Sequence, residues 1–134
     1  MGLARKKPDI TILPETIILL REIEKKFLSF VDTLARLKKT RDQREIKTAC
    51  VSLISIKTNL KEIIKADLEV SYDIIKTRFD KLYLFLEKNL ILLDRQREVN
   101  NAINDIKDNL NPILSLYYSL GGDRTEINKE LSKI

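Results

Sequence analysis

Apolar residues recur at three- and four-residue steps through most of the chain, the spacing that lines one side of an α-helix. The first predicted helix begins at Pro14, because proline suits the first helical position, and ends near Leu37 or Lys38. A second follows Asp42, which with Glu45 resembles an N-cap and its acidic N3 residue, and ends before Asp67. The inward positions are Leu20, Ile23, Phe27, Phe30, Val31 and Leu34 on the first helix, and Ile46, Ala49, Leu53, Ile56, Leu60, Ile63 and Ile64 on the second.

The same periodicity predicts two further helices. The third should begin near Ser71, whose hydroxyl can cap it, and run to the polar residues 94–97. The fourth should bend at Pro112 and end at Gly121 and Gly122. The inward positions are Ile75, Phe79, Leu82, Phe85, Leu86 and Leu93 on the third helix, and Val99, Ala102, Ile103, Ile106, Leu110, Ile113, Leu114 and Tyr117 on the fourth.

Short connections between such helices require neighbours to run antiparallel. We therefore predict an all-α, antiparallel four-helix bundle over residues 14–120, preceded by an N-terminal tail, 1–13, and followed by a tail or short helix, 121–134. No stretch alternates with period two for long enough to make a strand. A chain of 134 residues is the usual size of one domain.

Histidine is absent, which removes the commonest general base and the commonest metal ligand. The only cysteine, Cys50, cannot form an internal disulfide, and we interpret it as a small buried apolar residue. Gly121 and Gly122 lead into no phosphate-binding loop. We therefore expect no catalytic residues, no metal site and no cofactor, and a protein that is not an enzyme.

The longest apolar runs have four residues, too few to span a bilayer. Pro8 and Asp9 directly follow the basic cluster Arg5, Lys6 and Lys7, where a signal peptide would need an apolar stretch. We expect a cytoplasmic protein with no membrane partner. The net charge of +5 is spread over mixed acidic and basic positions, which favours a solvated surface over a dedicated anion-binding face.

A few apolar residues do not belong to the inward stripes. Val51 and Ile54 on the second helix, Leu84 and Ile91 on the third and Ile18 on the first project outward at 100° per residue. Two interpretations are open: a binding site for another protein, or a surface that the chain covers itself. The alternating residues Ile10, Ile12 and Leu13 could supply such a cover as an intramolecular plug.

Two segments resemble the flagellin-specific export chaperone family (FliS-like). Residues 13–20, Leu-Pro-Glu-Thr-Ile-Ile-Leu-Leu, are similar to the Thr/Ser-Pro-Glu start of that family's first helix and its aliphatic run. Residues 79–86, Phe-Asp-Lys-Leu-Tyr-Leu-Phe-Leu, are similar to its Leu-Asp-x-Leu-Tyr-x-Phe pattern on the third helix. The order and lengths of the predicted helices also agree over residues 13–114.

The resemblance implies a cytoplasmic chaperone for flagellar protein export. Such a protein binds the disordered C-terminal segment of flagellin, which orders on the chaperone and is kept from premature polymerisation. On this chain the expected partner-binding residues are Val51, Ile54, Tyr83, Leu84 and Ile91, with Ile10, Ile12 and Leu13 as a plug in the free protein.

Two alternatives remain open. One is nucleic-acid binding, since the first predicted turn gathers five basic residues that could neutralise phosphates: Arg36, Lys38, Lys39, Arg41 and Arg44. No aromatic residue interleaves them, which argues against nucleic acid as the partner. The chain could also be a structural subunit of a larger assembly. In solution we expect a monomer or a weak homodimer.

Overall fold

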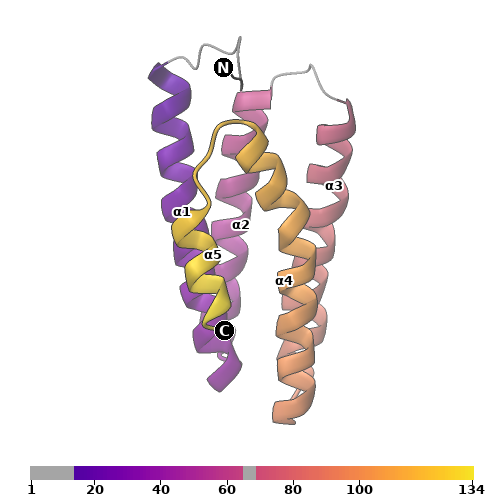
Figure 1. Cartoon of the computed structure of the whole chain (residues 1–134). Helices are drawn as coiled ribbons and strands as arrows, with labels where there is room; N and C mark the ends of the chain where they lie inside the picture. The colour runs from indigo at the N-terminus through magenta and orange to yellow at the C-terminus, as the bar shows by residue number, and fades with distance from the viewer. Residues whose placement is uncertain (1–13, 65–68) are drawn as a thin grey trace.

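The computed structural model describes the backbone of residues 14–64 and 69–134, and the side chains of the same residues except 69–75. Within these residues the protein is all-α and contains no strand (Figure 1). The predicted fold class is therefore confirmed at the level of helical content. The elements are α1 (Pro14–Lys39), α2 (Gln43–Ile64), α3 (Glu69–Leu84), η1 (Phe85–Asn89), η2 (Leu90–Leu92), α4 (Gln96–Ser119) and α5 (Thr125–Ser132).

The four longest of these helices lie side by side, and each runs opposite to the one before it (Figure 1). Helix α1 packs along α2, and α3 packs along α4. These two pairs are joined through contacts of α2 with α3 and η1, and of α1 with α4. The short α5 lies against α1, so the C-terminal region 121–134 contains a short helix rather than a loose tail.

The predicted inward residues of α1, α2 and α4 form the core. All are buried except Ile63, which is half-buried and packs against the core. In the predicted third helix, Phe79, Leu82 and Leu86 are buried, whereas Phe85 and Leu93 are only half-buried. The side chain of Ile75 lies outside the described residues. Leu90 is fully buried, although the prediction omitted it.

The prediction of one continuous third α-helix was wrong. The α-helix ends at Leu84, a π-helical turn follows over Phe85–Asn89, and a 3₁₀ turn follows over Leu90–Leu92. Leu93 then adopts an extended conformation with φ −89° and ψ 129°. The α-helical hydrogen bonding changes at Phe85, which lies between Leu84 and Leu86, so no polar position in the pattern marks the change.

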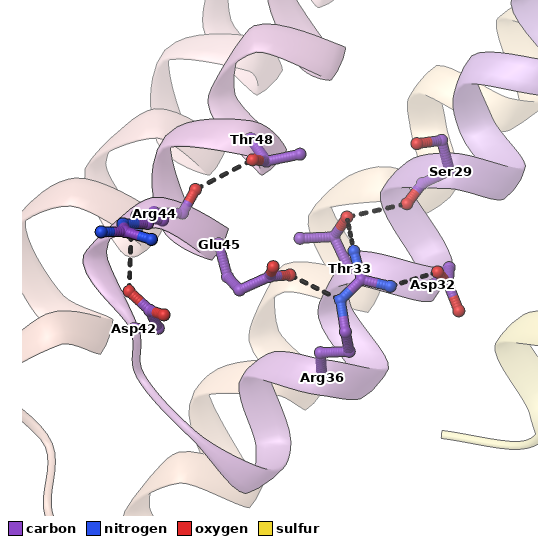
Figure 2. Close-up of polar contacts among 8 residues, drawn as sticks. All are labelled: Ser29, Asp32, Thr33, Arg36, Asp42, Arg44, Glu45 and Thr48. Carbon is purple, nitrogen blue, oxygen red and sulfur yellow. Dashed lines mark hydrogen bonds and ion pairs between the residues drawn. The ribbon is translucent and has the colours of Figure 1, made fainter.

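The connection between α1 and α2 is held by side chains on both helices (Figure 2). Asp42 caps α2 as predicted, because its carboxylate accepts a hydrogen bond of 2.9 Å from the backbone N–H of Arg44. Glu45 does not close a capping box. Its carboxylate instead accepts a 2.6 Å hydrogen bond from Nε of Arg36 on α1, and Arg36 also pairs with Asp32. Hydrogen bonds to Glu45 and then Asp32 raise the pKa of Arg36.

The turn between α4 and α5 is organised around Tyr117. Its ring is buried and meets Phe27 of α1 edge to face, with 5.3 Å between centroids. Its hydroxyl lies 3.3 Å from the carbonyl oxygens of both Leu20 and Asp123, which share its one hydrogen as acceptors. Gly121 adopts φ 107°, a conformation that glycine allows and other residues resist, and Gly122 lies directly over the ring.

Pro112 lies inside α4, whose direction changes in its C-terminal half (Figure 1).

Replacing Gly122 by alanine is expected to lower the free energy of unfolding by about 1–3 kcal/mol, the range for overpacked sites. A Cβ atom at this position would lie well inside van der Waals contact with the Tyr117 ring. Urea denaturation of the wild type and Gly122→Ala measures the difference. The double variant with Tyr117→Leu is the control, since removing the ring should remove most of the penalty. An unchanged urea midpoint for the single variant would contradict this packing.

Candidate functional site

The outward apolar residues of α2 and of the segment from α3 to η2 remain uncovered. Val51 and Ile54 are 60% and 54% exposed, and Leu84 and Ile91 are 52% and 37% exposed. Tyr83 is half-buried and packs against the core, where its ring lies 6.5 Å from that of Phe79. These five residues are those that the sequence singled out, and we call the surface they form the α2–α3 face. The prediction that these four aliphatic side chains lie outside the core is confirmed.

A pocket of about 240 Å³ adjoins this face at Ile91. It separates the N-terminal half of α2 from η1 and η2, and Ile91 forms part of its wall. Cys50, one residue before Val51, lines it from α2, and Glu87 lines it from η1. The other lining residues are Gln43, Ile46 and Lys47. An apolar recess that opens between two helices is the shape into which a side chain of a bound polypeptide could fit.

Contacts inside the pocket join the two walls. The Cys50 thiol is buried, and burial, followed by the negative charge of Glu87 and a hydrogen bond to its carboxylate, raises the thiol pKa to about 12. Burial also raises the pKa of Tyr83 to about 12, with further contributions from Cys50, Asp80 and Glu87. Cys50, Tyr83 and Glu87 are therefore close neighbours, and both acidic hydrogens stay in place at neutral pH.

Cys50 and Glu87 line the pocket and Leu92 is 79% exposed, although none of the three was among the predicted site residues. Gln43, Lys47, Cys50 and Ile54 follow one another at three- and four-residue steps, a signal that could have placed them on one face of α2. No comparable signal predicts η1. A π-helical turn contains one more residue than an α-helical turn, so it changes the direction in which the following side chains project. Such turns are frequent at functional sites.

Other exposed apolar residues lie away from this face. Ile17 and Ile18 are at the N-terminal end of α1, and Tyr118 is near the end of α4. Ile17 lines a second recess of about 280 Å³ beside Tyr117 and the turn that precedes α5. Ile10, Ile12 and Leu13, the predicted tail plug, lie outside the described residues.

The basic residues around the first turn are mostly engaged within the protein. Arg36 pairs with Glu45 and Asp32, and its Nη2 donates to Thr33 (Figure 2). The guanidinium of Arg41 donates to the carbonyl oxygen of Leu93 at 3.1 Å, and Lys38 donates to that of Ile134 at 3.4 Å. These side chains tie α1 and the connection after it to other parts of the protein, which weakens the case for a phosphate-binding patch.

The part of the chain that the structure describes lacks two kinds of feature. No group of three or more acidic or cysteine side chains there could hold a metal ion. No helix there has both the length and the hydropathy needed to cross a bilayer.

Alkylation of Cys50 by iodoacetamide is expected to be slow at pH 8, on the order of a thousandfold slower than that of a free cysteine, because only the thiolate reacts. With a pKa of about 12, the thiolate fraction should rise about tenfold per pH unit from pH 8 to 11. The rate measured by mass spectrometry at each pH tests this. A rate that levels off near pH 9 would show that the thiol is not held in its neutral form.

Comparison with known proteins identifies no relative: no family model, no curated protein and no solved structure matches this chain.

Proposed function

We propose that this protein is a helical adaptor or chaperone that binds an apolar segment of another polypeptide on its α2–α3 face. In this proposal α1, α2, α3 and α4 act as one antiparallel four-helix bundle, and the protein works by binding alone. The observation that carries the proposal is the exposure of Val51, Ile54, Leu84 and Ile91. Beside them a pocket lies between α2 and the η1–η2 segment, and Ile91 forms part of its wall.

The physical reason for such an arrangement is the hydrophobic effect. Exposed aliphatic side chains gain free energy when a partner covers them, at about 25 cal/mol per Å² of apolar surface removed from water. A disordered partner must also lose conformational freedom when it orders, so its apolar contacts have to outweigh that cost. An amphipathic helix meets both requirements, because it buries one apolar side and satisfies its own backbone hydrogen bonds.

The specific partner that we propose is the C-terminal segment of flagellin, bound in the cytoplasm before export. The choice of flagellin rests on the resemblance of residues 13–20 and 79–86 to the flagellin-specific chaperones. The second of these segments supplies Tyr83 and Leu84 of the α2–α3 face. Binding there would keep the flagellin segment from assembling too early.

Thermal unfolding with and without a peptide that spans the flagellin C-terminal segment tests this function. A ligand that binds only the folded state stabilises it by about 2.7 kcal/mol at roughly 100 times its Kd. We therefore expect a concentration-dependent rise in Tm, with no rise for a peptide of the same composition in scrambled order. An obligate dimer whose Tm ignores the peptide would instead support a structural subunit and would refute the proposal.

A further inference from the structure

The two walls of the α2–α3 face differ in charge. On α2, Lys47, Cys50, Ile54 and Lys57 follow one another at three- and four-residue steps, which places two ammonium groups beside the apolar side chains. Helix α2 has only two carboxylates, and Glu45 is engaged by Arg36. The wall of α2 is therefore basic where the pocket opens.

The opposite wall carries two carboxylates and, one turn before Asp80, the ammonium group of Lys76. Asp80 and Glu87 lie on either side of Tyr83 in sequence, and the charges of both help to raise the pKa of its phenol, so both carboxylates lie close to it. Glu87 also lines the pocket itself. Both side chains are exposed, so a bound partner can reach them.

These charges do not neutralise one another directly. Among the residues that the structure describes, no ion pair within 4 Å joins Lys47 or Lys57 to either carboxylate. The α2 side of the face thus presents the ammonium groups of Lys47 and Lys57, and the α3–η1 side presents the carboxylates of Asp80 and Glu87. A partner that covers this face must place its own polar flanks against both sides, where matching charges attract and like charges repel.

We infer that the α2–α3 face fixes the direction in which a bound amphipathic helix lies. This inference rests on the proposed function, since it concerns the partner of that same surface. The helix that fits carries carboxylates along one flank of its apolar stripe and lysines or arginines along the other. When such a helix is turned end for end with its apolar side still down, its two flanks exchange places. Only one direction then puts its carboxylates against Lys47 and Lys57 and its cations against Asp80 and Glu87.

Two synthetic helical peptides of about 18 residues test this inference. Both have the same leucine stripe and the same composition, with glutamate on one flank and lysine on the other, but the flanks are exchanged between them. Each carries a nitroxide at its N-terminus. Paramagnetic broadening of protein methyl resonances shows which end of the face the N-terminus occupies, with Leu92 at one end and Leu60 toward the other.

We expect the two peptides to bind in opposite directions. At low salt, the population of each peptide bound in its preferred direction should exceed the population bound in the reverse direction about tenfold. The excess should shrink at high salt, because these charges are exposed to solvent. The variant with Lys47→Glu, Lys57→Glu, Asp80→Lys and Glu87→Lys should reverse the direction of both peptides. These four side chains lie at the surface or half-buried, so the circular dichroism of the variant should match the wild type.

The possible failures are distinguishable. If both peptides bind in the same direction, or each in both directions equally, the inference is wrong while the proposed function stands. If neither peptide binds at millimolar concentration, the proposed function fails and the inference fails with it. Methyl resonances of this face that shift with protein concentration before any peptide is added would assign the face to a second copy of the chain and would also overturn the inference.

Discussion

Leu84→Glu is expected to lower the affinity for the flagellin segment by at least about thirtyfold, which corresponds to about 2 kcal/mol, the loss typical of a residue central to an interface. Leu84 is 52% exposed and lies next to Tyr83, so partner atoms that cover it would have to desolvate the new carboxylate. The folded protein should tolerate the change, because the glutamate side chain can extend into water. Circular dichroism and isothermal titration calorimetry measure the two effects.

The matched control is Ile18→Glu. Ile18 is an aliphatic residue with 62% exposure, but it lies on α1, outside the α2–α3 face. This variant introduces the same charge on a similar side chain and should bind the flagellin segment like the wild type. Equal losses of affinity in both variants would mean that the negative charge acts through the overall field of the protein. Unchanged affinity in Leu84→Glu would remove α3 from the binding surface.

Tyr117→Ala is expected to lower the free energy of unfolding by about 3–5 kcal/mol, as large-to-small changes of buried aromatic residues do. The ring contacts Phe27, supports Gly122 and lies between α1 and the turn that precedes α5. Its removal would leave a cavity where these elements meet. Urea denaturation gives the difference from the wild type.

Tyr117→Phe separates the contribution of the ring from that of the hydroxyl. Phenylalanine keeps the packing but leaves the carbonyl oxygens of Leu20 and Asp123 without this donor, which should cost about 1 kcal/mol. If the phenylalanine variant lost as much stability as the alanine variant, the hydroxyl network would dominate and the packing argument would be wrong. A loss below about 1 kcal/mol for alanine would show that the site collapses around the missing ring.

Helical periodicity predicted most of the core, because it reports which side of each helix faces its neighbours. Phe27, Leu53 and Ile106 each have apolar neighbours three or four residues away, and each is fully buried. The start of α2 was predictable for a similar local reason, since Asp42 caps the helix that it precedes. Such features depend on residues close together in sequence.

Features that depend on distant residues were not predictable. Glu45 has the spacing of a capping-box residue, but Arg36 across the turn offers a charged partner and holds it. The hydroxyl of Tyr117 reaches Leu20, 97 positions away in sequence, which no local pattern reveals. The change from α- to π-helical hydrogen bonding at Phe85 falls within a run of apolar residues that looks continuous.

The candidate site was predictable only in part. The outward direction of Val51, Ile54 and Leu84 follows from the angle between successive helical residues, and the structure confirms their exposure. The pocket depends on how far η1 stands from α2, and on Cys50 and Glu87 meeting across that space. That separation is a property of packing between helices, and periodicity within one helix does not contain it.

The central claim is that a foreign polypeptide rests on the α2–α3 face, and site-specific photo-crosslinking tests it most directly. A photoreactive phenylalanine analogue replaces Ile54, Leu84 or, as the control, Ile18, and each protein is irradiated with the flagellin C-terminal segment. We predict covalent adducts from positions 54 and 84 and none from position 18. Adducts from position 18 alone, or adducts from none of the three under conditions where the segment binds, would contradict the claim.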